Sequence, residues 1–297
     1  MIYSTHLILL IVVMMLDGYK LQTSMATSTS VIIPYRGLYV DGFKSILGDE
    51  TKEDSLLKWC TSNNFNALSL YDLNQIMDSS ALDVQLAQFI AKTRITFGID
   101  QIAAVRGASA NFIQNAQYDS SQTDLNKRFS VYNLEREWWN NGPSCNFTCY
   151  TSILQTMKTT GKNETPPMTV ETYIGWFKNP DGQELEQANT LVSYLDRILV
   201  HDYQKSPQID YMTSRLSFLG QAAKSQNRSM DVIVIFSAEP DFMADYFNVT
   251  SQNHSFEDAY VNIFNQFNAT TFDYKEYVRL IGYQIFAYSY ARMARPT

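Results

Sequence analysis

The stretch Asp231–Glu239, DVIVIFSAE, is the clearest strand signal in the chain. Val232–Phe236 are apolar without interruption, Ser237 and Ala238 follow, Glu239 ends the run, and Pro240 breaks the pattern directly afterwards. A short continuous apolar run bounded in this way is typical of a strand that is buried on both faces, as in a parallel sheet. The stretch therefore predicts a buried strand with a carboxylate at its carboxyl end.

Seven further runs share this design, in which β-branched, apolar or aromatic residues lead to a polar or acidic end. They are Arg36–Phe43, Ala67–Leu73, Ile95–Ile102, Ser130–Glu137, Met168–Phe177, Arg197–Tyr203 and Arg279–Tyr288. Segments with helical spacing of apolar residues lie between them, most clearly at Glu53–Asn63, Ala81–Thr93, Gly182–Asp196 and Tyr211–Ser225. Strands that alternate with helices predict a mainly parallel sheet.

Eight such units favour an α/β fold, a single closed (β/α)8 barrel over residues 30–297, more than an open doubly wound sheet. The first run, RGLYVDGF, contains no Gly-rich phosphate loop, which removes the main reason to expect a dinucleotide-binding fold. Little chain remains after Tyr288. The last helix of the barrel is therefore expected to be reduced or missing.

The N-terminus predicts a signal peptide over residues 1–25. Leu7–Leu16 is an apolar run that is short for a membrane span and suited to the core of a signal peptide, although Lys and Arg are absent before it. A membrane anchor and a buried helix are the alternatives. Sequons at Asn146, Asn163, Asn227, Asn248, Asn253 and Asn268 agree with a secreted, N-glycosylated protein that is free of the membrane after signal removal.

Composition excludes several classes of function. The chain of 297 residues has a net charge of −7, a pI near 5.0 and no basic patch, so we expect no nucleic-acid partner. Cys145 and Cys149 either pair with each other, leaving Cys60 free, or one of them pairs with Cys60. The spacing of the Cys and His residues resembles no zinc site, so we expect neither a metal nor another cofactor.

The chemistry of a (β/α)8 barrel lies at the carboxyl ends of its strands, where this sequence places acidic and aromatic residues. The candidate binding residues there are Asp41, Tyr71, Asp72, Asp100, Asn133, Glu171, Trp176, Asp202, Tyr203 and Tyr283, and the candidate catalytic residues are Glu135, Glu137 and Glu239. Paired carboxylates among aromatic rings are what glycosidic cleavage requires, because one acid protonates the leaving oxygen while another group attacks or activates water.

The fourth run, SVYNLERE, gives the most specific prediction of catalytic residues. Residues two apart in a strand point to one side, so Asn133, Glu135 and Glu137 are predicted to face the barrel axis together. The alternative is that NLEREWW begins a helix with exposed glutamates. The β-like SVYNL before it and Gly142-Pro143 after it favour a strand that ends here.

The spacing of these residues resembles the strand-4 motif Asp-x-Asp-x-Glu of the chitinase-like glycoside hydrolase family 18. The resemblance implies that Glu137 is the proton donor, Glu135 the acid that orients the substrate's N-acetyl group, and Asn133 the buried first member. Asp202-Tyr203 is similar to that family's Tyr/Asp pair in reversed order. Asn133 and Glu135 stand where the family has aspartates, and Leu280–Tyr288 lacks the family's strand-8 tryptophan.

A rival assignment uses the same barrel. Many retaining glycosidases place the acid at the end of strand 4 and the nucleophile at the end of strand 7, which here are Glu137 and Glu239, with Arg136 where those enzymes have Asn. The sequence thus favours a secreted glycoside hydrolase that acts on oligo- or polysaccharide. A non-catalytic carbohydrate-binding barrel and a secreted structural or interaction protein are the alternatives.

Overall fold

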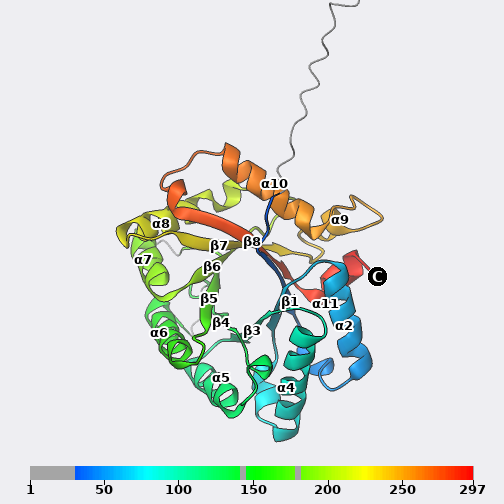
Figure 1. Cartoon of the computed structure of the whole chain (residues 1–297). Coiled ribbons are helices and arrows are strands. Elements are labelled where there is room, and N and C mark those ends of the chain that lie inside the picture. The colour runs from blue at the N-terminus through cyan, green and yellow to red at the C-terminus, as the bar shows by residue number, and fades with distance from the viewer. Residues whose placement is uncertain (1–30, 141–144, 178–181, 297) are drawn as a thin grey trace, which may run out of the picture. The chain divides into compact units, whose positions relative to one another are not determined.

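The computed structural model describes residues 31–140, 145–177 and 182–296, so the predicted signal peptide lies outside the described residues. Eight parallel strands form a closed barrel in the sequential order β1 to β8, and β8 pairs with β1 to complete the ring (Figure 1). The prediction of a single (β/α)8 barrel is confirmed.

Seven of the strands overlap their predicted runs, which extend a few residues past the carboxyl end of each strand, and the third strand is displaced. They are β1 (Tyr35–Val40), β2 (Ala67–Leu70), β3 (Gln101–Arg106), β4 (Val131–Leu134), β5 (Thr169–Ile174), β6 (Arg197–His201), β7 (Met230–Ser237) and β8 (Val278–Phe286). The prediction of a strand over Ile95–Ile102 was wrong, because the preceding helix continues through Ile95 and a turn follows it.

Helices surround the ring on its outside (Figure 1). They are α2 (Glu50–Ser62), α3 (Leu73–Met77), α4 (Ser80–Ile95), α5 (Ser109–Ser121), α6 (Phe147–Asn163), α7 (Glu184–Tyr194), α8 (Asp210–Ser225), α9 (Ala244–Phe247), α10 (Phe256–Ala269) and α11 (Tyr288–Ala294). All four predicted helices are present, as α2, α4, α7 and α8. The eighth unit ends in the short α11, so the prediction of a reduced last helix is also confirmed.

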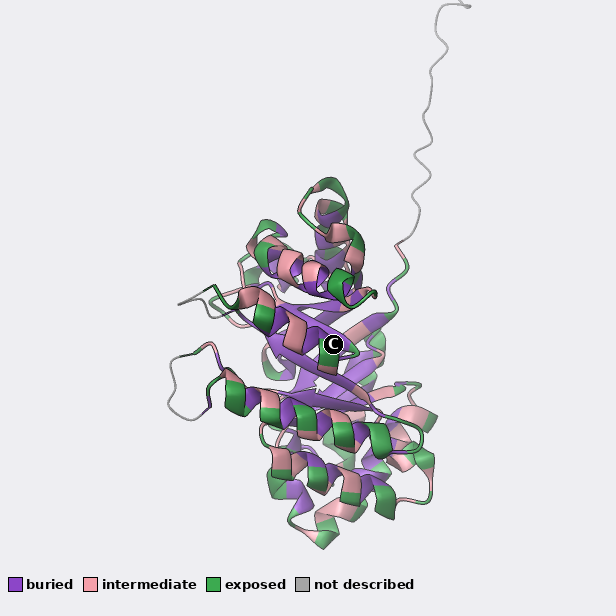
Figure 2. Cartoon of the chain, turned by 90° about the vertical axis from the view of Figure 1, so that its left-hand side faces the viewer, coloured by how far each residue is buried: buried purple, intermediate pink, exposed green. Residues whose placement is uncertain are grey.

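The strands are buried almost throughout, whereas the helices are buried only on the side that faces them (Figure 2). Two glycines allow close approach inside the ring. A Cβ on Gly282, which has φ +152° beside a register shift between β7 and β8, would lie 1.9 Å from the Tyr35 carbonyl oxygen. A Cβ on Gly37 would lie 1.9 Å from Gln284 Oε1. Glycine at these positions lets β1 and β8 pair and leaves room for a buried polar side chain.

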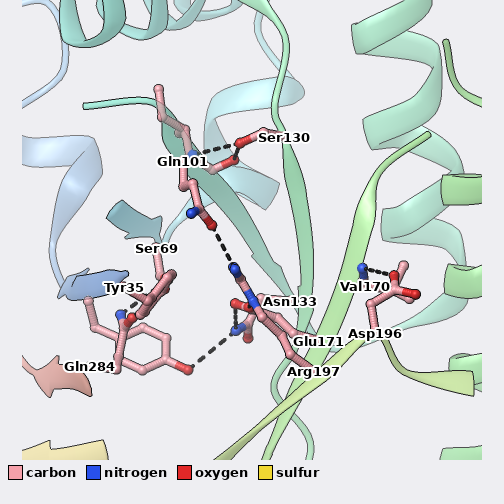
Figure 3. Close-up of polar contacts among 12 residues, drawn as sticks. Tyr35, Ser69, Gln101, Ser130, Asn133, Val170, Glu171, Asp196, Arg197 and Gln284 are labelled. Atoms are coloured by element: carbon pink, nitrogen blue, oxygen red, sulfur yellow. Dashed lines mark hydrogen bonds and ion pairs between the residues drawn. The ribbon is translucent and has the colours of Figure 1, made fainter. Parts of the chain in front are cut away.

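A polar network fills the interior of the barrel below its carboxyl end (Figure 3). The Arg197 Nε atom donates to Glu171 Oε2 at 2.5 Å, and Arg197 Nη1 donates to Gln101 Oε1 at 2.7 Å. Asn133 Nδ2 donates to Glu171 Oε1 at 2.7 Å. Glu171 is fully buried, so its charge requires this paired and hydrogen-bonded environment. The network therefore forms a polar floor under the open end of the barrel.

Candidate functional site

Two adjoining cavities open at the carboxyl ends of the strands. The inner cavity of about 220 Å³ is lined by Tyr39, Tyr71, Glu135, Glu137, Tyr173, His201, Tyr203, Ile235 and Phe286. The outer cavity of about 580 Å³ extends over the ends of β2, β3 and β4 and includes Asp72, Asn74, Gln75, Arg106, Arg136 and Asn140. Tyr71, Glu135, Glu137 and Tyr173 line both cavities. The two predicted strand-4 glutamates thus lie where the cavities meet.

Glu135 and Glu137 lie just beyond the end of β4. The prediction that the strand continues through Glu137 was wrong, because β4 ends at Leu134, where β3 also ends at Arg106. The Glu135 amide still donates to the Arg106 carbonyl oxygen at 2.9 Å, and the backbone pairing between the two strands ends with this hydrogen bond. Both carboxyl groups consequently reach the cavity from the loop rather than from the strand.

Glu135 is the more enclosed of the two acids. Its Oε2 atom is buried and has no hydrogen-bond partner among the described residues. Burial raises the pKa of Glu135 to about 7, the negative charge of Glu137 adds to the rise, and a hydrogen bond from the Tyr71 hydroxyl opposes it. A carboxyl group of this kind holds its proton in the neutral range, where it can serve as an acid.

Glu137 is exposed to the cavities and held by neighbouring side chains. The Tyr173 hydroxyl donates to Glu137 Oε1, and the Asn140 side-chain amide donates to Oε2. Tyr173 lies on β5 and Asn140 on the loop after β4, so two elements position this carboxyl group. The arrangement presents one exposed and one buried carboxyl group to the same space.

Aromatic side chains form most of the wall of the inner cavity. The ring centroids of Tyr39 and Tyr71 lie 5.5 Å apart, and those of Tyr39 and Phe286 lie 5.8 Å apart. Burial raises the pKa of Tyr39, Tyr71 and Tyr203 well above the usual value, and the charge of Glu135 adds to the rise in each case. These phenols therefore remain neutral and offer both apolar faces and hydroxyl groups to a bound molecule.

His201 lines the inner cavity and was missed from the sequence. It is the last residue of β6, and its ring centroid lies 4.4 Å from that of Tyr203. Burial and the charge of Arg215 lower the pKa of His201 to about 3, with a smaller opposing effect of the Gly175 backbone. Strand alternation offered a signal, since His201 and Tyr203 point to one side while Asp202 points to the other.

Tyr39, Phe286 and Asn140 were also not singled out as binding residues, although they line one of the cavities. Tyr39 could have been found, because it is an aromatic residue near the carboxyl end of the predicted strand RGLYVDGF, where the cavity of such a barrel opens. The loop residue Asn140 had no comparable signal.

Two predicted site residues lie away from the cavities. Asp100 precedes β3 and so lies at the amino end of the barrel, which follows from the misplaced third strand. Tyr283 points outward from β8, where its ring packs against Phe65 and against Tyr260 of α10. Its neighbour Gln284 points inward instead and accepts a hydrogen bond from Tyr35 at 2.7 Å. Both residues contribute to the fold.

Asn133 and Glu171 belong to the polar floor of the barrel. Asn133 is fully buried in β4, close to Tyr39 of the inner cavity, with 3.4 Å between Asn133 Nδ2 and the Tyr39 hydroxyl. Glu171 lies in the first half of β5, bound to Arg197. The structure therefore places Asn133 directly beneath the cavity, whereas Glu135 and Glu137 reach into it.

The remaining candidates differ in their position relative to the two cavities. Asp72 and Tyr203 line the outer and inner cavity respectively. Asp41 borders a separate surface hollow and accepts from the Ser289 amide at 3.0 Å. Asp202 is buried behind β6, where it accepts from the Gln208 amide at 2.9 Å and burial raises its pKa to about 7. Glu239 follows β7 and accepts from the Ser237 hydroxyl at 2.8 Å, outside the lining of both cavities.

Cys145 and Cys149 form a disulfide at the start of α6, and Cys60 is free and buried in α2. Of the two pairings open to the sequence, the short one is present, and Cys145 lines the outer cavity. Across the described residues, no cluster of His, Cys, Asp and Glu side chains has the make-up of a metal site. No helix in the described part of the chain has the length and apolar character that crossing a bilayer requires.

Comparison with known proteins yields matches among solved structures alone. No protein-family model and no curated protein matches the chain. A putative phosphonomutase from Burkholderia cenocepacia J2315 aligns with a TM-score of 0.45 and 10% identity over 87% of this chain and 88% of its own. The ICChI chitinase from Ipomoea carnea aligns with a TM-score of 0.43 and 12% identity over 86% and 95% of the two chains.

A GH18 chitinase from Cycas revoluta, solved as a mutant in complex with (GlcNAc)4, aligns with a TM-score of 0.43 and 10% identity over 87% of this chain and 96% of its own. At these identities and TM-scores the resemblance concerns the barrel architecture alone.

Proposed function

We propose that this protein is a glycoside hydrolase-like barrel that binds oligo- or polysaccharide in the two cavities and cleaves a glycosidic bond with the Glu135–Glu137 pair. The observation that carries the proposal is the juxtaposition of a buried, proton-holding carboxyl group and an exposed carboxyl group in one aromatic cavity. Acid catalysis of glycoside cleavage requires a carboxyl group that keeps its proton near the working pH. Aromatic walls suit the apolar faces of pyranose rings.

In this proposal the pair shares one proton, which Glu135 holds before the substrate binds. The proton then moves to Glu137, which faces the substrate and gives it to the leaving glycosidic oxygen, and Glu135, left as a carboxylate, takes up the proton that the attacking group releases. The bond from the anomeric carbon to that oxygen breaks as the proton arrives, and a water molecule or a substituent of the substrate supplies the new bond to carbon. Two acids this close titrate as a pair, so loss of either changes the proton affinity of the other. Tyr173 and Asn140 hold Glu137 in position.

The rival assignment, with Glu239 as nucleophile, has less support. Glu239 lines neither cavity and is occupied by the Ser237 hydroxyl. Its charge does reach Tyr203 at the cavity wall, so the residue is not remote. The two assignments differ in one measurable respect, which is whether Glu239→Gln removes activity.

Activity and binding should be measured on one panel of probes, namely tetrasaccharides of β-1,4-linked glucose, N-acetylglucosamine and mannose. The variants are Glu135→Gln, Glu137→Gln and Glu239→Gln, with Glu186→Gln on the exposed surface of α7 as the matched control. Removal of a catalytic acid should lower kcat by about 10²–10⁴-fold, the usual contribution of general acid–base catalysis. Full activity in Glu137→Gln would overturn the assignment.

A non-catalytic carbohydrate-binding barrel is the second candidate. The feature that favours it is Asn133, an amide bound within the polar floor at a position where a further acid would complete the strand-4 series. Binding of a probe by the wild type without any cleavage would establish this candidate, and absence of both would leave a structural or interaction role.

We further propose that the protein is secreted and N-glycosylated. The support is the predicted signal peptide, which lies outside the described residues, together with the position of the sequons. Asn146, Asn163, Asn227, Asn253 and Asn268 are exposed, and Asn248 is half-buried. Treatment of protein from a eukaryotic secretory host with an N-glycosidase should lower its mass, whereas an unchanged mass would contradict glycosylation.

A further inference from the structure

Trp176 stands out on the rim of the barrel, next to the inner cavity but outside its lining. It follows β5, and its residue surface remains 47% exposed, the largest exposure of any tryptophan in the described chain. An isolated exposed apolar residue needs no explanation by itself. Trp176 differs from such a residue, because Arg215 and Tyr211 pack against its indole.

Arg215 supports one face of the indole. The guanidinium carbon lies 4.7 Å from the centroid of the Trp176 ring, within the range of a cation–π interaction. Arg215 is itself fixed, since its Nη1 atom donates to the Gly175 carbonyl oxygen at 2.6 Å and to the His201 carbonyl oxygen at 3.0 Å. The ring of Tyr211 packs edge-on against Trp176, with centroids 5.0 Å apart. Arg215 thus lies over the indole and Tyr211 lies against it, while 47% of the residue surface stays exposed.

A row of rings leads from Trp176 to the inner cavity. The centroids of Trp176 and His201 lie 6.4 Å apart, and those of His201 and Tyr203 lie 4.4 Å apart. His201 and Tyr203 line the inner cavity, and the outer cavity lies at the opposite side over β2 to β4. A chain that leaves the inner cavity on the β5–β6 side passes Trp176.

We infer that Trp176 is a binding subsite for a further sugar residue, which stacks the apolar face of its pyranose ring on the exposed surface of the indole. The inference rests on the proposed carbohydrate function and adds that the ligand is an extended chain that crosses the mouth from the outer cavity to Trp176. A pre-positioned ring loses little side-chain entropy on binding, which is why a fixed tryptophan suits this task. The subsite should contribute affinity to long chains and none to short ones.

The test compares chain lengths. Dissociation constants are measured for the di- and hexasaccharides of β-1,4-linked N-acetylglucosamine and of β-1,4-linked glucose, by calorimetry with the Glu137→Gln variant background to prevent turnover. Trp176→Ala should weaken binding of the hexasaccharide about tenfold, the effect of exposing roughly 50 Å² of apolar surface, and leave the disaccharide unchanged. Trp176→Phe should restore most of the loss, because it keeps an aromatic face.

Leu125→Ala is the matched control, since Leu125 is 54% exposed and precedes β4 at the other end of the barrel. Equal binding of the hexasaccharide by wild type and Trp176→Ala would overturn the subsite and leave the proposed function standing. Equal weakening of both chain lengths would also overturn it, because the residue would then act through the fold. Failure of the unsubstituted barrel to bind any of these probes would overturn the proposed function together with the subsite.

Discussion

Tyr71 tunes the acid that we place at the centre of the site. Its hydroxyl donates to Glu135 and thereby favours the ionised carboxylate, in opposition to burial and to the charge of Glu137. Tyr71→Phe removes this donor while keeping the ring. The pKa of Glu135 should therefore rise above about 7 by roughly one unit, the effect of losing one good hydrogen bond to the charged form.

Carbon-13 NMR of labelled glutamate side chains measures this shift directly, without a substrate. Tyr246→Phe is the matched control, because Tyr246 packs against Phe247 and His254 away from both cavities. An unchanged or lowered pKa of Glu135 in Tyr71→Phe would show that the phenol does not stabilise the carboxylate.

Strands β5 and β6 are tied together inside the barrel by the Glu171–Arg197 pair. Glu171 is fully buried and Arg197 is 8% exposed, so neither charge has much access to water. Arg197→Met leaves the Glu171 carboxylate without its cation, and removal of one partner of a buried pair costs about 3–5 kcal/mol in the free energy of unfolding. Urea denaturation monitored by circular dichroism measures the loss.

The double variant Glu171→Gln/Arg197→Met is the informative companion to this experiment. It removes both charges, so it should recover a large part of the stability lost in Arg197→Met. If the double variant is as unstable as the single one, the pair acts through shape and hydrogen bonds rather than through charge.

The strands could be predicted because each is a short apolar run with a defined end, and the ends marked the cavity correctly at β2, β4 and β6. The third strand could not, because Ile95, Thr96 and Phe97 have strand-like side chains although the chain there completes α4 and turns. Local preference was overruled by the packing of the helix.

The facing of individual residues at strand ends was harder to predict than the strands themselves. A polar residue near a strand end is predicted to face the cavity. Asp202 and Tyr283 point outward instead, because alternation along the strand places them on the other side. The ion pair between Glu171 and Arg197 could not be predicted either, because the two residues lie on different strands and are distant in sequence. Contacts between strands fix these positions, and a single sequence does not display them.

At the scale of the whole molecule, several buried groups make stability depend on pH. Burial raises the pKa of Asp119, Glu135 and Asp202 to about 7, from unfolded values of 3.8, 4.5 and 3.8. The folded protein therefore holds more protons than the unfolded chain between those values. This stabilisation is fully present below the unfolded pKa and is lost as the pH rises through about 7.

His201 acts in the opposite direction. Its folded pKa of about 3 lies below the usual 6.5, so protonation of the unfolded chain destabilises the fold as the pH falls below 6.5. The combined effect of the three acids on the free energy of unfolding is larger than the opposite effect of His201. Above pH 6.5, His201 no longer changes this free energy with pH. The free energy of unfolding should consequently fall by about 3 kcal/mol between pH 5 and pH 8, allowing for partial solvation of the acids.

Urea unfolding at pH 5, 6.5 and 8 provides the measurement. Asp202→Asn, which removes one of the three titrations, should show a shallower decline than the wild type. A protein that grows more stable from pH 5 to pH 8 would contradict the assignment of these acids as proton-holding groups.

A disulfide bond holds part of the wall of the outer cavity in place. Cys145 lines this cavity and is fixed by its bond to Cys149, one turn into the start of α6. Reduction frees Cys145 from its anchor, so the shape of the outer cavity depends on the thiol–disulfide balance of its surroundings. In protein folded in a reducing cytosol, the disulfide would not hold the wall of the outer cavity in place. Ligand measurements should therefore use protein in which Cys145 and Cys149 are oxidised.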